Sequence, residues 1–163
     1  MAEYSGSELL AKLENSVGHE IVHRAPDALG RPSFRMYALS IGDFNPLYTD
    51  GEFAQSHGLK DVMAPPTLIC DTWQYLDGDI DERGDFIERG ELDFTGRLRG
   101  GNDYEFFQPV HPDDVITAHW KVKDVFEKTG RSGHIVFQII EATFYNQRDE
   151  LLARNLETLF YRL

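Results

Sequence analysis

The sequence predicts an α+β fold in which helices come first and an antiparallel sheet follows. Helix start and stop signals are concentrated in the first half of the chain. Four segments rich in β-branched and aromatic residues, separated by turn residues, fill the second half. A length of 163 residues is sufficient to bury one core without disulfides, so we expect a single domain over 1–163.

The first two helices are predicted from capping residues and apolar spacing. An S-x-x-E capping box at Ser5–Glu8 precedes leucines at helical spacing, and Gly18 follows as a stop signal. The second helix is expected over Ser33–Ile41, where apolar residues recur at i, i+3, i+4 and i+7 from Phe34. Gly42 stands directly after it, where a left-handed residue commonly ends a helix.

Two shorter helical elements and an acidic stretch complete the first half. Asp50 is expected to cap a short helical turn that ends at Gly58, and Pro65–Pro66 are expected to open a helix over Thr67–Leu76. The acidic stretch 77–93 is typical of a solvated surface loop. Its first carboxylates have EF-hand spacing, but glycine is missing at the sixth position of that motif, so we expect no metal site.

The second half is expected to form an antiparallel β-meander. Along one of its segments Ile116, Ala118, Trp120 and Val122 alternate with polar residues, so one face of that strand should be buried. The helix at Thr67–Leu76 is the candidate to cover this face. The four segments are Arg97–Val110, Val115–Lys128, His134–Asn146 and Leu152–Leu163.

The charge balance excludes one class of partner. The chain has 16 Lys and Arg against 28 Asp and Glu, a net charge of -12, and it contains no basic run, so nucleic-acid binding is not expected. The acidic excess is uneven, because residues 1–93 carry a net charge of -11 and residues 94–163 carry -1. An anionic ligand would therefore find its positive charge mainly in the second half. The cations considered for such a site are Arg97, Arg99, Lys121, Lys123 and Arg131.

The sequence predicts a cytoplasmic protein that does not interact with membranes. The first twenty residues carry acids and no apolar signal core, and no run of about 18 uncharged apolar residues occurs. Cys70 is the only cysteine, so no intrachain disulfide can form. Because it falls in an apolar predicted helix, it is expected in the core rather than as a nucleophile.

One irregular segment concentrates side chains that can carry chemistry. After Gly42, the residues Asp43, Asn45 and Tyr48 present a carboxylate, an amide and a phenol beside Pro46. Asp and Asn also favour turns through local hydrogen bonds between side chain and backbone, so a purely structural role is the alternative interpretation.

The segment Gly42–Tyr48 resembles the Gly-Asp-x-Asn-Pro-x-His signature of the MaoC-like (R)-specific enoyl-CoA hydratase family. Met63–Thr67 resembles the Ala-Pro-Pro-Thr of the N-terminal-type dehydratase branch of that family. Gly100–Asp114 and Asn146–Leu151 are also similar to that branch. The resemblance extends from about residue 34 to residue 162.

The resemblance implies a hot-dog fold, in which an antiparallel sheet wraps around a central helix, and pairing as a homodimer or as a heterodimer with another hot-dog chain. It also implies reversible hydration of an acyl-CoA or related acyl-thioester, without a cofactor. Asp43 and Asn45 match residues of the family's catalytic motif, whereas Tyr48 replaces its histidine. A phenol with a pKa of ~10 is a poor base at neutral pH, where an imidazole with a pKa of ~6.5 exchanges protons readily.

This departure leaves several functions open. In one, the chain is a companion subunit whose partner carries the intact Asp/His pair. In another, it is a homodimeric hydratase in which Asp43 works with Tyr48 or His57. A non-catalytic acyl-CoA-binding module and a hot-dog thioesterase are the remaining alternatives.

Substrate contacts are expected near the start of the third helix, where the family places backbone N–H donors for the thioester. Trp73 and Leu76 of that helix, with Phe106 and Phe107 of a strand, can line an acyl tunnel or simply pack in the core. The residues expected to contact substrate are His57, Ala64, Pro66, Thr67 and Trp73. The histidines expected in structural roles are His111, His119 and His134.

Overall fold

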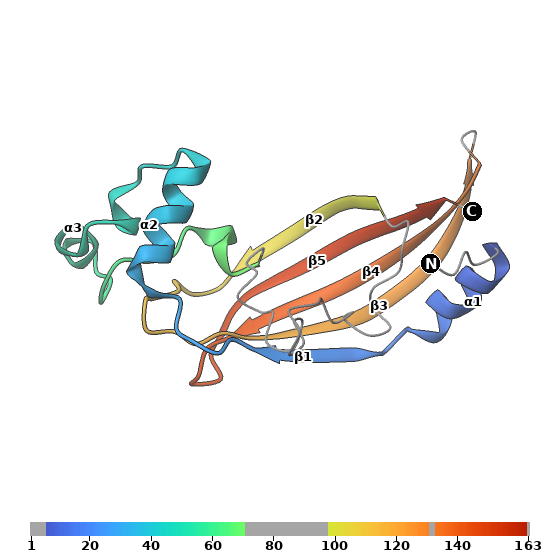
Figure 1. The fold of residues 1–163 in the computed structure, drawn as a ribbon, viewed down its shortest axis with the longest axis horizontal. Helices are drawn as coiled ribbons and strands as arrows, with labels where there is room; N and C mark the ends of the chain where they lie inside the picture. The colour runs from blue at the N-terminus through green and yellow to red at the C-terminus, as the bar shows by residue number, and fades with distance from the viewer. Residues whose placement is uncertain (1–5, 71–97, 131–132, 163) are drawn as a thin grey trace, which may run out of the picture.

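The computed structural model describes residues 6–70, 98–130 and 133–162, and its largest element is a five-stranded antiparallel sheet (Figure 1). The strand order is β1-β3-β4-β5-β2, and every neighbouring pair is antiparallel. The α+β class and the four predicted strands are confirmed, although β2 ends before the predicted boundary. The strands are β1 (Glu20–Arg24), β2 (Leu98–Phe106), β3 (Thr117–Gly130), β4 (Gly133–Tyr145) and β5 (Leu151–Arg162).

The strand order differs from the predicted meander at one link. The strands β3, β4 and β5 follow one another as hairpins, but β2 pairs with β5 at one edge of the sheet. The segment 107–116 therefore carries the chain across the end of the sheet from β2 to β3. The prediction of a simple meander was wrong here because local patterns identify strands, whereas their neighbours are set by contacts distant in sequence.

The strand β1 at the opposite edge is not predicted by the sequence. It pairs with β3, with Ile21 opposite Trp120. Its five residues alternate between exposed and half-buried positions, and none is fully buried. This strand is short, and three of its five residues are charged or histidine, so its sequence shows little alternation of apolar and polar residues. Only its pairing with β3 in the fold identifies it as a strand.

Alternate strand residues face a buried core, as the sequence predicts. Ile116, Ala118 and Val122 are fully buried, and Trp120 packs against the same core. Along β4, every second residue from Val136 to Phe144 is buried. One face of the sheet is thus the core face, and the intervening residues point to the other side.

Helix α2 (Gly30–Ile41) begins three residues before the predicted start at Ser33. Leu29 occupies the N-cap position, and its side chain makes no capping hydrogen bond. Instead, the Leu29 N–H donates to the Asp114 carbonyl at 3.2 Å, and the Gly30 N–H donates to the Pro112 carbonyl at 2.9 Å. Contacts with a distant loop therefore set the start of this helix, which capping residues alone do not reveal.

The short helix α3 (Gly51–Ser56) has the predicted cap. The Asp50 carboxylate accepts hydrogen bonds from the Glu52 and Phe53 N–H groups at 3.0 and 3.1 Å. The predicted helix Thr67–Leu76 is described only at its start, where η2 (Pro66–Ile69) is a 3-10 helix. Trp73, Leu76 and the acidic stretch 77–93 lie outside the described residues, as does Ser5 of the first capping box.

Two apolar clusters hold the helices against the sheet at opposite ends (Figure 1). At one end, Phe34 of α2 and Ile69 of η2 belong to a cluster with residues of β3, β4 and β5. At the other end, Leu13 of α1 (Gly6–Asn15) packs with Val136 and Tyr161. Within the described ranges, every helix is too short to cross a membrane.

Replacing Phe34 by alanine should lower the free energy of unfolding by about 3–5 kcal/mol, because its side chain is fully buried and leaves a cavity. Urea unfolding, monitored by circular dichroism, measures this decrease in the free energy of unfolding. The matched control is Met36→Ala on the exposed side of the same helix, where Met36 is 63% exposed and the expected change is within about 0.5 kcal/mol. Equal losses in the two variants would contradict the assignment of Phe34 to the core.

Candidate active site

The signature segment begins at the C-terminal end of α2. Gly42 adopts φ 72°, and its N–H donates to the Leu39 carbonyl at 3.2 Å. The Asp43 N–H donates to the Ala38 carbonyl at 2.9 Å. These two bonds form a Schellman motif, which a glycine at this position accommodates without strain. The backbone of Asp43 is thereby attached directly to the end of the helix, and the predicted stop at Gly42 is confirmed.

The polar side chains of the segment fold its backbone into consecutive turns. The Asn45 N–H donates to Oδ1 of Asp43 at 3.1 Å, and the Leu47 N–H donates to Oδ1 of Asn45, also at 3.1 Å. The second bond caps the 3-10 helix η1 (Pro46–Tyr48). Asp43 and Asn45 therefore do have the turn role considered above. Asp43 is nevertheless exposed, so its carboxylate remains accessible.

Tyr48 is buried directly behind this turn, with 7% of its surface exposed. Burial raises the pKa of its phenol, and the charge of Asp43 and a hydrogen bond to that side chain raise it further, against an opposing effect of Asn45. The phenol therefore remains protonated at neutral pH. At neutral pH Tyr48 is thus a hydrogen-bond donor beside an accessible carboxylate.

Hydrogen bonds join the signature segment to the Met63–Thr67 segment. The Met63 N–H donates to the Leu47 carbonyl at 3.0 Å. The hydroxyls of Tyr37 on α2 and Thr67 lie 2.9 Å apart and share a hydrogen bond. The two segments that carry the family resemblance thus lie together in the fold, both attached to α2.

An open pocket of about 350 Å³ lies between the Met63–Thr67 segment and the loop that follows β2. The Ala64 N–H donates to the Val110 carbonyl at 2.8 Å and holds the two sides together. Phe106 and Phe107 are 44% and 50% exposed at its rim, so they are not core residues. The lining is mainly apolar and consists of Leu59, Met63, Ala64, Pro66, Phe106, Phe107, Gln108, Pro109 and Val110.

The pocket brings together only some of the residues predicted to contact substrate. Ala64 and Pro66 line it, and Thr67 adjoins it through Pro66. Trp73 lies outside the described residues. Sequence reasoning missed Leu59, Met63 and Gln108, because loop residues without periodicity give no local signal. For the side of the pocket formed by Met63–Thr67, the resemblance of that segment to a family motif was the one indication in the sequence.

His57 lies at the C-terminal end of α3, and its contacts are with that helix. Its Nδ1 donates to the Phe53 carbonyl at 2.8 Å, and its ring stacks on the Phe53 ring with centroids 4.1 Å apart. Its assignment to substrate binding therefore remains a prediction. None of the described His, Cys, Asp and Glu side chains form a group of three that could hold a metal ion.

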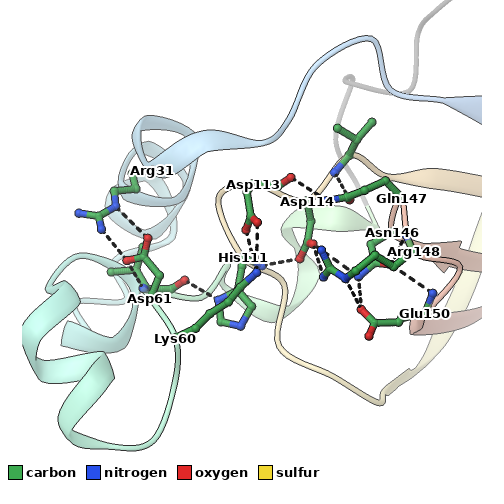
Figure 2. Close-up of polar contacts among 12 residues, drawn as sticks. Arg31, Lys60, Asp61, His111, Asp113, Asp114, Asn146, Gln147, Arg148 and Glu150 are labelled. Atoms are coloured by element: carbon green, nitrogen blue, oxygen red, sulfur yellow. Dashed lines mark hydrogen bonds and ion pairs between the residues drawn. The ribbon is translucent and has the colours of Figure 1, made fainter.

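A buried carboxylate fixes the loop that carries the far wall of the pocket (Figure 2). The side chain of Asp114 is 1% exposed, and its Oδ2 accepts the backbone N–H of His111 at 2.8 Å. Its Oδ1 accepts from Arg148 at 3.0 Å and from Asn146 at 3.5 Å. Asp114 thus links the crossing segment 107–116 to the turn between β4 and β5.

The same network reaches the other wall through His111. Its Nδ1 donates to the Val62 carbonyl at 3.2 Å, directly before Met63. Arg31 of α2 pairs with Asp61 at 2.6 Å. Burial alone would raise the pKa of the Asp61 carboxyl, but hydrogen bonds from Arg31 and the Val62 N–H, with the charge of Arg31, outweigh burial and lower it. His111 therefore has the structural role that the sequence predicts.

Comparison with known proteins agrees with this architecture. The ChsH1–ChsH2 complex from Mycobacterium tuberculosis superposes with a TM-score of 0.75 at 18% identity, over 96% of this chain and 90% of that one. Solved MaoC-like dehydratases share the same arrangement. The chain thus has the hot-dog fold of MaoC-like dehydratases, as the resemblance implies.

The model of the FAS1-like dehydratase domain region matches residues 15–155, and the chain belongs to that family. A UPF0336 protein of Streptomyces coelicolor is 29% identical over 117 residues, which are 72% of this chain and 75% of the relative. A probable enoyl-CoA hydratase alpha subunit of Thermomonospora curvata is 25% identical over 163 residues, 91% of this chain. This chain spans 50% of that longer relative.

Replacing Asp114 by alanine should lower the free energy of unfolding by about 3 kcal/mol, because the His111 N–H loses its buried acceptor and Arg148 loses one of its two carboxylate partners. The neighbouring variant Asp113→Ala is the control. Asp113 is 65% exposed and pairs with Lys60, so its loss should cost less than about 1 kcal/mol. Thermal and urea unfolding of both variants measure the difference, and an Asp114→Ala protein as stable as Asp113→Ala would contradict this role.

Proposed function

We propose that this chain is the companion subunit of an enoyl-thioester hydratase/3-hydroxyacyl-thioester dehydratase, and that it pairs with a second hot-dog chain carrying the intact Asp/His pair. One observation carries the proposal. At the position of the family's histidine stands Tyr48, which is buried and whose pKa is raised by burial and by Asp43. The signature segment therefore has a protonated phenol at neutral pH where the family has an imidazole.

The chemistry explains why this matters. Hydration requires a base that takes a proton from water as its oxygen attacks the β-carbon, an acid that protonates the α-carbon, and donors for the enolate oxygen. Asp43 can accept a proton or orient water, and the Tyr48 phenol can donate a hydrogen bond. Neither supplies the acid and base exchange that a histidine performs near pH 7.

The described contacts of the Asp43 side chain include no histidine. All six histidines of the chain lie within the described residues, and the contacts of Asp43 are with its own segment, at Asn45 and Tyr48. His119 pairs with Glu20, and His134 pairs with Glu127 on the neighbouring strand. This distribution supports a histidine supplied by a partner chain.

The apolar pocket supplies a role for the companion subunit itself. Its walls are aliphatic and aromatic, and Gln108 is the one side-chain amide among its lining residues. Such a surface suits an acyl chain better than a charged head group. Two similar proteins, the ChsH1–ChsH2 complex and a probable enoyl-CoA hydratase alpha subunit, are named as parts of assemblies with more than one kind of chain, which also supports this role.

The purified chain alone should turn over crotonyl-CoA at a rate at least about 100-fold below that of the complex with its partner, because a missing acid–base group costs about 10²–10⁴-fold in rate. The loss of the enoyl-thioester absorbance measures this rate. In the complex, Asp43→Asn in this chain should lower kcat/KM by less than about 10-fold. Replacing the partner's motif histidine should abolish turnover.

Robust turnover by the isolated chain would overturn the companion role and favour the second candidate, a homodimeric hydratase, which the contact between Asp43 and Tyr48 supports. In that case Asp43→Asn should abolish activity. If Tyr48 acted as its base, activity would also keep rising with pH beyond 10, because the pKa of the phenol is raised. Release of free thiol from a saturated acyl-CoA would instead indicate a thioesterase.

A further inference from the structure

The pocket beside Met63–Thr67 is apolar over its described lining. Eight of its nine lining residues are aliphatic or aromatic, and Gln108 carries the one side-chain amide. None of the nine is charged. The pocket lies where η2 comes close to the end of β2 (Figure 1). A group that fills this space must be a hydrocarbon group, because a charged group would lose its hydration there without gaining a partner.

The two walls of the pocket are fixed before any ligand binds. The Ala64 N–H donates to the Val110 carbonyl at 2.8 Å, which joins one wall to the other. The Phe107 N–H donates to the Leu152 carbonyl at 2.9 Å and attaches the far wall to β5. The buried carboxylate of Asp114 holds the loop that follows. A pocket formed in this way selects its ligand by volume, because its walls are held at a set distance.

The volume of the pocket sets the size of that group. The pocket measures about 350 Å³. An apolar cavity of about 150 Å³ holds one benzene molecule, which corresponds to about 25 Å³ for each carbon atom. On this scale the pocket has room for about 14 carbon atoms. A four-carbon acyl group would fill only a small part of it and would leave water against the remaining apolar walls.

We propose that this pocket selects long acyl groups, and that the ligand of the chain is an acyl-thioester whose acyl group has about 12–16 carbons. The thioester is taken from the proposed function, on which this inference rests, and hydration takes place at the first three carbons. These carbons stay outside the pocket, where catalytic groups reach them, and the remaining carbons lie against the apolar walls. The companion subunit thus determines the length of the substrate, while its partner carries out the chemistry.

Two side chains, one on each wall, contact the acyl chain in this arrangement. Phe107 is 50% exposed at the opening, so an acyl chain that enters the pocket covers its ring. Met63 is half-buried in the opposite wall, and it is the backbone N–H of Met63 that donates to the Leu47 carbonyl. Both side chains can therefore be replaced without loss of the hydrogen bonds that hold the walls, because those bonds use backbone groups.

Calorimetric titration of the purified chain with saturated acyl-CoAs of 4, 8, 12 and 16 carbons tests the selected length. A saturated thioester has no double bond to hydrate, so the measurement needs neither catalytic activity nor a partner. Full burial of one methylene raises affinity about fourfold, and an open pocket that covers about half of each methylene gives about twofold. Affinity should therefore rise about 200-fold between the 4-carbon and 12-carbon ligands. Equal affinity for these two ligands, or no binding of the 12-carbon ligand, overturns the proposal.

The variant Met63→Gln tests whether the acyl chain lies along this wall. It keeps the length of the side chain but adds an amide that a bound acyl chain strips of water, so affinity for the 12-carbon ligand should fall about 10-fold. Affinity for the 4-carbon ligand should stay within about twofold. The matched control is Met36→Gln on α2, where Met36 is 63% exposed, and it should change neither affinity. Every ligand carries the same CoA group, so an effect on that group would lower both affinities alike.

The variant Phe107→Ala removes the ring at the opening and should also lower affinity for the 12-carbon ligand about 10-fold. Circular dichroism checks that each variant is folded. If Met63→Gln and Phe107→Ala both leave the ratio of the two affinities unchanged, the acyl chain does not lie in this pocket and the proposal is wrong. Robust turnover by the isolated chain would refute the companion role but not the dependence of affinity on chain length, whereas a flat series of affinities would refute the selected length alone.

Discussion

The crossing of the chain from β2 to β3 is the constraint on which the rest of the structure depends. The two strands are consecutive in sequence but occupy opposite parts of the sheet, so residues 107–116 must pass the ends of β5 and β4. The buried carboxylate of Asp114 fixes that passage to the turn between these strands through Arg148 and Asn146. The carbonyls of Asp114 and Pro112 also receive the first N–H groups of α2. Sheet, helix and pocket are therefore connected at one loop.

Sequence reasoning identified the parts of the fold that are specified locally. Alternation at Ile116 and Ala118 and the glycine after α2 are short-range signals, and the structure agrees with both. The parts of the fold that the sequence did not predict are those set by contacts between residues distant along the chain. The start of α2 depends on Asp114, and β1 exists through its pairing with β3. A pattern read along the chain cannot contain such information.

In the candidate site, too, some features could be predicted from the local sequence and others depend on distant contacts. Its signature residues were found because a motif is local, and their turn geometry follows from the hydrogen-bonding habits of Asp and Asn. The burial of Tyr48 was not predictable, since neighbours far along the chain decide it. Burial is nevertheless what changes the interpretation, because it turns a residue that merely replaces histidine into one whose proton is firmly held.

The attachment of the site to α2 has a consequence for how such a protein can diversify. Asp43 is tied to the end of α2, and Thr67 to its side through Tyr37. The opposite wall, from Phe106 to Val110, belongs instead to the sheet and its crossing loop. The signature segment and the Phe106–Val110 wall of the pocket thus lie on different supports. Substitutions at Phe106 or Phe107 can therefore change the volume of the pocket without touching the residues that fix the backbone of Asp43.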